Sequence, residues 1–236
     1  MSLSGGKNQL QREAWVLIPA HNEEETIAQV VSQTARHVAQ VWVVADGCAD
    51  ETAAAACSAG ARVIELPRRR GKGAALKEAW KILLTFNEWS ALILLDGDGQ
   101  HDPSYLPSFL EVWGQTGAEV VLGRRTFDSM PLLRAITNRF MSFSLSALIQ
   151  KKVADSQCGF RLLTREFIAE QPWLANHFEI ESEIIFRAAR RGWRIAEVPV
   201  PTIYQREKSK IRPFQDGCRW GACLMRHALR RAEVAR

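Results

Sequence analysis

Short apolar runs alternate with amphipathic stretches along the first half of the chain. Apolar runs with the length and composition of buried strands occupy residues 14–20, 41–46, 61–66, 91–95 and 117–123. The stretches that connect the first four runs repeat apolar residues at helical spacing, at residues 24–39, 49–60 and 71–86. This alternation predicts an α/β fold with a mainly parallel sheet, right-handed connections and helices on both faces.

The second half of the chain is less regular. Residues 131–150 carry apolar side chains on one helical face, and residues 178–193 predict another helix, which Gly192 ends. Residues 194–204 alternate and contain two prolines, which favours an edge strand. We expect three parts: a flexible N-terminus at residues 1–13, one α/β domain at 14–212, and a basic amphipathic helix at 213–236. The last helix either packs on the domain, which we favour, or lies on a membrane.

Composition sets limits on the class of protein. The chain has 236 residues, of which 47% are hydrophobic and 24% charged, enough for one substantial core. No apolar run approaches the roughly 18 residues that span a bilayer, and the N-terminus lacks a signal peptide, so we expect a cytoplasmic protein. The five cysteines form no CxxC pair, so reduced thiols are expected.

Charge is unevenly spread. The net charge is +5, yet residues 187–236 hold 13 Lys or Arg against 4 Asp or Glu. This asymmetry suggests an anionic partner, which would be nucleic acid, a phosphate-bearing substrate or a membrane surface; a solvated charged face is the alternative.

Acidic residues follow three of the predicted strands. The segments PAHNEEE (19–25), DGCADET (46–52) and DGDGQHDP (96–103) leave the sheet at its carboxyl edge, where open α/β sheets bind ligands. Glu23, Asp46, Asp96 and Asp98 are therefore expected to converge there. Adjacent ionised carboxylates repel each other, so the pair Asp96 and Asp98 indicates a bound cation or a shared proton, unless the segment is only a solvated turn. Mg²⁺ or Mn²⁺ held by carboxylates normally completes its shell with substrate phosphates.

Seven ordered segments carry a family resemblance. They are PAHNEEETI, ADGCADET, RGKGAALKEA, LLDGDGQHDP, VLGRR, DSQCGFRLLTRE and YQREKSKIRP, and they span about residues 14 to 215. Together they closely resemble family 2 glycosyltransferases, in particular the branch that makes polyprenyl-phosphate sugars. The resemblance implies a GT-A fold, with residues 14–212 as the catalytic domain. It also implies metal-dependent, inverting transfer of a hexose from a UDP-glucose or GDP-mannose type of donor to a polyprenyl phosphate or related lipid. DSQCGF favours UDP-glucose.

The resemblance also implies a role for each matched residue. Nucleotide-binding residues would be Pro19, His21, Glu23, Asp46, Lys72 and Asp96, and metal ligands would be Asp96, Asp98 and Gln100. Catalytic residues would be Asp98, Arg125, Glu181 and Glu183. Acceptor or diphosphate contacts would be Arg134, Arg139, Arg206, Ser209 and Lys210. His21 stands where the family usually has Tyr, which leaves the base open, and Lys72 has an alternative reading as part of a helix-capping turn. The spacing of Glu181 and Glu183 places them on different sides of a helix, with one facing the site and the other solvated.

The acceptor decides whether a general base is needed. A phosphomonoester is already largely a dianion at neutral pH, so positioning and metal electrostatics would suffice. A hydroxyl acceptor would require a carboxylate base, for which Asp155, Glu181 and Glu183 are candidates.

Other classes of protein fit less well. A nucleotidyltransferase or an NAD-dependent oxidoreductase needs a glycine-rich loop after the first strand, and PAHNEEET has none. A nucleic-acid-binding module would explain the basic tail, but the acidic loops would repel a polyphosphate. We therefore expect no nucleic-acid partner, and an enzyme that is cytoplasmic and peripheral on the inner face of a membrane.

Overall fold

The computed structural model describes residues 9–125, 130, 132–170, 172–201, 203 and 217–226. Its strands are β1 (Ala14–Ala20), β2 (Gln40–Asp46), β3 (Arg62–Leu66), β4 (Ala91–Leu94), β5 (Val120–Arg125), β6 (Arg161–Thr164) and β7 (Ile195–Val200). Its helices are α2 (Ile27–Thr34), α3 (Thr52–Ser58), α4 (Lys72–Leu83), α5 (Leu106–Thr116), α6 (Leu132–Ile149), α7 (Arg165–Ala169) and α8 (Ile180–Arg190), with a 3₁₀ turn η1 (Pro103–Tyr105). Residues 9–13 are helical, and residues 1–8 lie outside the described residues.

One seven-stranded sheet has the order β3-β2-β1-β4-β6-β5-β7. The strands β3, β2, β1 and β4 pair in parallel, and so do β5 and β7, which confirms a mainly parallel sheet with β7 at its edge. The strand β6 was not predicted. It lies between β4 and β5 and pairs antiparallel with both of them, so β4 and β5 do not pair with each other. Its four residues are all buried and show no alternation, so they carry no strand signal of their own.

The direction of β6 matters for the site. Since β6 runs against its neighbours, its first residue lies at the edge where β1, β2, β4 and β5 end. The segment that leads into β6, at residues 155–160, is thereby brought to the same edge as the acidic loops.

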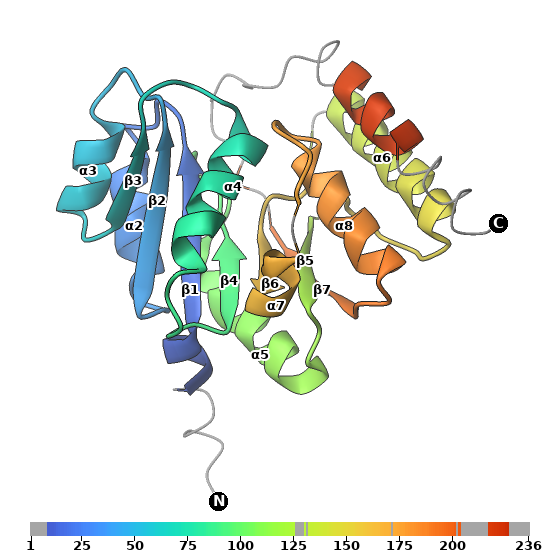
Figure 1. The fold of residues 1–236 in the computed structure, drawn as a ribbon, viewed down its shortest axis with the longest axis horizontal. Coiled ribbons are helices and arrows are strands. Elements are labelled where there is room, and N and C mark those ends of the chain that lie inside the picture. Colours follow the sequence, from blue (N-terminus) through green and yellow to red (C-terminus); the bar gives the residue numbers. More distant parts are fainter. Residues whose placement is uncertain are drawn as a thin grey trace, which may run out of the picture.

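Helices cover both faces of the sheet, as the sequence predicts (Figure 1). Residues of α4, α7 and α8 join the core on one face, whereas residues of α2, α3 and α5 join the core on the other. The first residue of α4 follows Gly71, which has φ +96°, and a Cβ there would lie 2.2 Å from His177 Nδ1. Only glycine fits this turn, and the turn fixes the position of Lys72.

The helix α6 lies at one side of the molecule, together with the helical residues 217–226 (Figure 1, upper right), and adds Leu145 to the core on the face of α8. Trp220 is 9% exposed, donates its indole N–H to Ser182 Oγ at 3.1 Å, and has its ring centroid 6.2 Å from that of Phe140. Residues 217–226 therefore pack on the domain, which was the favoured arrangement; residues 213–216 and 227–236 lie outside the described residues. Among the helices within the described ranges, none has both the length and the apolarity to cross a membrane.

Candidate functional site

The three acidic loops meet at the carboxyl edge of the sheet, as the sequence predicts. Hydrogen bonds join the first loop to the second, from the Ala49 N–H to Asn22 Oδ1 (2.9 Å) and from the Glu23 N–H to Thr52 Oγ1 (2.8 Å). The hydroxyl of Thr26 donates to the carbonyl of Gly97 at 2.7 Å, which joins the first loop to the third. Sequence-distant loops are thus held as one unit.

Lys72 lies at the centre of a buried charge cluster, which we define as Lys72, Asp96, Arg161 and Glu181. Its Nζ is 2.6 Å from Asp96 Oδ1 and 2.7 Å from Glu181 Oε1. Burial alone would lower the pKa of Lys72, but the charges of Asp96 and Glu181 outweigh burial and hold that pKa above its usual value. In the same way, burial would raise the pKa of Asp96, and the Lys72 ammonium holds it well below its usual range.

Arg161 completes this cluster from behind and was not among the predicted site residues. It is fully buried, with Nε 2.9 Å from Glu181 Oε2. Its guanidinium also donates to three backbone carbonyls, those of Cys158 (2.7 Å), Ser156 (2.8 Å) and Glu181 (2.5 Å). These contacts fix the carboxylate of Glu181 against Lys72.

Gly159 is the point where the backbone approaches this cluster. A Cβ at this position would lie 2.3 Å from Asp96 Oδ2 and 2.8 Å from Lys72 Nζ. The segment before β6 is therefore packed directly on the acidic loop, and a side chain would displace the ion pair.

Asp98 has the opposite environment from Asp96. Its carboxylate accepts from the Gln100 backbone N–H at 3.0 Å. Burial, together with the negative charge of Asp96, raises the pKa of Asp98 above its ordinary value. A cation beside Asp98 would remove this penalty, so the pair fits a divalent ion on electrostatic grounds.

The donor set also limits how an ion is held. Within the part of the chain that the structure describes, no three His, Cys, Asp or Glu side chains are placed to hold a metal by themselves. An ion at Asp96 and Asp98 would need further oxygen donors, from Gln100 or from a ligand such as a diphosphate. This is the usual arrangement for Mg²⁺, which keeps few protein ligands.

Arg125 and Asp155 form a second buried pair at this edge. Arg125 Nε lies 2.6 Å from Asp155 Oδ2, and Nη2 lies 3.0 Å from Oδ1, with the two residues 6% and 1% exposed. Burial would raise the pKa of Asp155, but the hydrogen bond and charge of Arg125 lower it. A carboxylate with a lowered pKa is a weak base.

Glu183 lies apart from Glu181. It accepts from the backbone N–H groups of Leu174 (3.1 Å) and Ala175 (2.7 Å), and its Oε1 is 2.9 Å from Arg187 Nε. Glu181 and Glu183 do lie on different sides of α8, but the prediction that one is solvated is wrong, because they are 3% and 1% exposed. The segment that connects α7 to α8 covers the carboxylate of Glu183 through Leu174 and Ala175.

The predicted nucleotide-binding residues gather around the first two loops. Asp46 accepts from the backbone N–H groups of Arg70 and Gly71, both at 2.7 Å, so it orders the turn that precedes Lys72. His21 Nδ1 is 2.8 Å from the Asp46 carbonyl, and Pro19 is in β1 beside this loop. Lys72 is the first residue of α4, which agrees with the alternative of a helix-start turn, and its contact with a nucleotide stays a prediction.

The predicted acceptor residues are only partly covered by the structure. Arg134 and Arg139 lie on α6, where Arg139 is exposed and Arg134 half-buried. Arg206, Ser209 and Lys210 lie outside the described residues.

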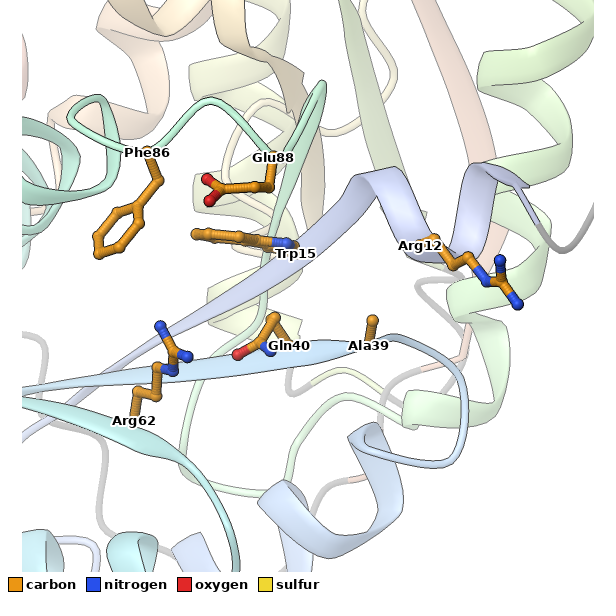
Figure 2. Close-up of a pocket in the computed structure, with 7 residues that line it drawn as sticks. All are labelled: Arg12, Trp15, Ala39, Gln40, Arg62, Phe86 and Glu88. Atoms are coloured by element: carbon orange, nitrogen blue, oxygen red, sulfur yellow. The ribbon is translucent and has the colours of Figure 1, made fainter.

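Two hollows in the structure differ in their relation to these loops. One of about 340 Å³ is at the opposite edge of the sheet, where Figure 2 shows Trp15 between Glu88 and Gln40. It lies at the amino ends of the parallel strands, at the opposite edge from the three acidic loops. A smaller hollow of about 180 Å³ is lined by Thr26, Gly99 and His101, beside the acidic loop.

The chain is similar in sequence to known glycosyltransferases. The family described as "Glycosyl transferase family 2" matches residues 15–171. A dolichyl-phosphate hexose transferase of Haloferax volcanii is 31% identical over 220 residues, covering 91% of this chain and 93% of its own length. A dolichyl-phosphate beta-glucosyltransferase of Mus musculus is 27% identical, with 89% of this chain and 73% of its own length covered.

A solved structure shows the same fold. Glucosyl-3-phosphoglycerate synthase from Mycobacterium tuberculosis, in complex with Mn²⁺, uridine diphosphate and glucosyl-3-phosphoglycerate, has a TM-score of 0.76 at 20% identity. The match covers 97% of this chain and 84% of that one.

Proposed function

The chain belongs to glycosyl transferase family 2 and has the GT-A fold, and from this premise we propose that it moves a hexose from a nucleotide sugar to a polyprenyl phosphate. The observation that carries the proposal is the pair Asp96 and Asp98 beside Lys72, at the edge where the strands of both halves of the sheet end. Two relatives named for dolichyl-phosphate substrates support the choice of acceptor.

The donor diphosphate would lie against the acidic loop. A divalent ion bound by Asp96, Asp98 and Gln100 would supply charge stabilisation to the diphosphate as it leaves the sugar. Among the described residues, Lys72 is a cation in direct contact with Asp96, and its ammonium is positioned by Asp96 and Glu181. Its ammonium would donate to a phosphate oxygen when Asp96 turns to the metal. Mn²⁺ and uridine diphosphate in the M. tuberculosis synthase support this arrangement.

The candidate bases favour a phosphate acceptor. Asp155 is paired with Arg125, Glu181 lies between Lys72 and Arg161, and Glu183 binds Arg187 and two backbone N–H groups. Each carboxylate therefore already has a cation as its partner, so its oxygens are not free to take a proton from a hydroxyl. A phosphate dianion needs no such base, and in-line attack on the anomeric carbon would invert its configuration.

A transfer assay tests this proposal. The purified chain is incubated with radiolabelled UDP-glucose or GDP-mannose and a polyprenyl phosphate, with Mn²⁺, with Mg²⁺ or with EDTA. We expect metal-dependent labelling of the lipid, and a loss in kcat of about 10²–10³-fold in Asp98→Asn, as for removal of a group that stabilises developing charge. Asp102→Asn, in the same loop, is the matched control and should retain activity.

Two outcomes would overturn the proposal. Labelling of a hydroxyl acceptor, without labelling of the polyprenyl phosphate, would reassign the acceptor. Thermal stabilisation by DNA, with none by UDP or GDP in the presence of Mn²⁺, would indicate a nucleic-acid-binding module. Activity at the cytoplasmic face of a membrane is part of the proposal, because the acceptor is a lipid.

A further inference from the structure

A chain of hydrogen bonds links four separate segments behind the candidate site. Trp220 Nε1 donates to Ser182 Oγ at 3.1 Å, and Gln157 Nε2 donates to the same oxygen at 3.2 Å. Gln157 Nε2 also donates to Ser156 Oγ at 3.0 Å, and Ser142 Oγ lies 3.1 Å from Ser156 Oγ. We call these five residues the polar chain. It connects the helical segment that holds Trp220, the helix α8, the segment that leads into β6, and α6.

The polar chain is buried, and its donors and acceptors satisfy one another. Ser142, Ser156 and Ser182 are 4%, 0% and 0% exposed, and Trp220 is 9% exposed. Both hydrogens of the Gln157 amide nitrogen have an acceptor, and Ser182 Oγ accepts two hydrogen bonds, which fills both lone pairs of a hydroxyl. Removal of one donor leaves a buried oxygen less satisfied, which is unfavourable where water cannot replace the donor.

One end of the polar chain adjoins the buried charge cluster. Ser182 follows Glu181 in α8, and the carboxylate of Glu181 is 2.7 Å from Lys72 Nζ. The backbone carbonyl of Ser156 accepts from Arg161 Nη2 at 2.8 Å. The polar chain is therefore fixed to the part of the site that holds Asp96, through both α8 and the segment that leads into β6.

The other end of the polar chain is on α6. The Ser156 backbone N–H donates to Ser142 Oγ at 2.9 Å, in addition to the contact between the two hydroxyls. The same helix carries Arg134 and Arg139, which are predicted to bind the acceptor phosphate. Gln157 lies between these two ends, so its side chain links the acceptor helix to the charge cluster.

We propose that Ser182 and Trp220 are positioning residues for the transfer reaction, which act through Gln157 to hold α6 at a fixed distance from the buried charge cluster. This inference rests on the proposed function, in which the cluster adjoins the donor diphosphate and α6 presents the acceptor phosphate. Transfer depends on the distance between the two substrates, so a small shift of α6 would slow the reaction without weakening the binding of the donor.

The substitution Trp220→Phe tests this inference, because it removes the indole N–H and keeps an aromatic ring in place. We expect kcat for transfer to polyprenyl phosphate to fall about tenfold, as for the loss of one hydrogen bond, while the KM for the nucleotide sugar changes less than about twofold. The matched control is Trp193→Phe. Among the residues that the structure describes, the indole N–H of Trp193 is buried without a hydrogen-bond partner, so this variant should keep the parent kcat.

A double variant shows whether Trp220 acts through Ser182. The substitution Ser182→Ala removes the oxygen that Trp220 and Gln157 share, and it should lower kcat by at least about tenfold. Adding Trp220→Phe to this variant should cause no further loss, because the hydrogen bond between the two residues is already absent. Losses that multiply would show that Trp220 acts independently of Ser182 and would overturn the inference.

Measurements of fold and of donor binding separate positioning from general damage. Calorimetric titration with UDP and Mn²⁺ should give the parent affinity in Trp220→Phe, and its circular dichroism should be unchanged. If this variant fails to fold, Gln157→Met makes the same test at a half-buried position, because it removes both amide donors and should lower kcat in the same way. A folded variant with the parent kcat would overturn the inference, and so would a loss of UDP affinity as large as the loss of kcat.

The two proposals fail in different ways. Parent chain that labels polyprenyl phosphate, with equal kcat in Trp220→Phe and Trp193→Phe, supports the proposed function and overturns the positioning residues. Parent chain that labels only a hydroxyl acceptor overturns the proposed function. The same comparison of kcat on that acceptor then tests the positioning residues, and a tenfold difference between the two variants would still support them.

Discussion

Replacing Arg161 with Met tests whether the buried charge cluster holds the site together. The substitution keeps most of the apolar stem and removes the guanidinium that binds Glu181 and three backbone carbonyls. Removing one partner of a buried pair leaves an uncompensated charge and costs about 3–5 kcal/mol. Since 1 kcal/mol shifts Tm by about 2–4 °C in a chain of this size, we expect a fall of roughly 6–20 °C.

An exposed ion pair provides the comparison. Arg194 Nη2 is 3.1 Å from Glu119 Oε1, but its side chain is 65% exposed, so Arg194→Met should cost about 1 kcal/mol or less. Urea unfolding of both variants measures the difference in the free energy of unfolding. If Arg161→Met costs no more than Arg194→Met, then Glu181 does not depend on Arg161 and the assignment of this cluster as a rigid support is wrong.

Three further predictions follow from the same edge of the sheet. Asp98→Asn should raise the free energy of unfolding of the metal-free protein at pH 7 by about 0.5–2 kcal/mol. The pKa of Asp98 is raised in the folded protein, so the ionised carboxylate destabilises the fold once the pH is above that pKa. An amide at this position carries no such charge. Asp155→Asn should destabilise the protein at pH 7, because the Asp155 carboxylate, whose pKa Arg125 lowers, stabilises the fold at neutral pH. This stabilisation is lost in acid as Asp155 is protonated, so the variant should lose less stability than the parent below about pH 4. Gly159→Ala should abolish metal-dependent nucleotide binding, because its Cβ would lie 2.3 Å from Asp96.

Each of these has its own measurement. Thermal melts with and without Mn²⁺ test Asp98→Asn, and an unchanged Mn²⁺ shift would argue against a metal ligand. Acid titration of unfolding tests Asp155→Asn, where an unaltered pH profile would contradict the assigned pKa. For Gly159→Ala, calorimetric titration with UDP and Mn²⁺ is compared with Gly217→Ala, whose Cβ would meet no atom within 4 Å. Equal affinity in these two variants would show that the close approach at Gly159 is tolerated.

The sequence predicted the half of the fold that local pattern encodes. The strands β1, β2 and β4 are uninterrupted apolar runs, and a parallel sheet brings their carboxyl ends together, so the convergence of the acidic loops was predictable. The family resemblance and the GT-A fold are confirmed as well. The strand β6 was missed, because four buried residues after a loop motif carry neither length nor alternation.

Ion pairs between segments that are distant in the sequence could not be predicted from the local pattern of residues. Arg161 begins a short apolar segment and reads as a surface cation, yet its partner Glu181 is on a helix that starts almost twenty residues later. From the sequence, Glu183 and Glu181 have the same expected role. In the structure, Glu183 instead accepts hydrogen bonds from the backbone N–H groups of residues 174 and 175. The available signal was that Arg161, like Gly159, belongs to the segment DSQCGFRLLTRE, which carries the family resemblance.

The antiparallel strand β6 separates the strands β1, β2 and β4 from the strands β5 and β7. The acidic loops come from the strands on one side of the β4–β6 boundary, whereas α6 and the Arg125 pair come from the stretch that leaves β5 and returns into β6. Evolution can therefore lengthen or rebuild that stretch, and with it the recognition of a second substrate, without changing the register of the strands that present Asp96. If the proposed function holds, exchange of this stretch between relatives should change the acceptor and leave the donor unchanged.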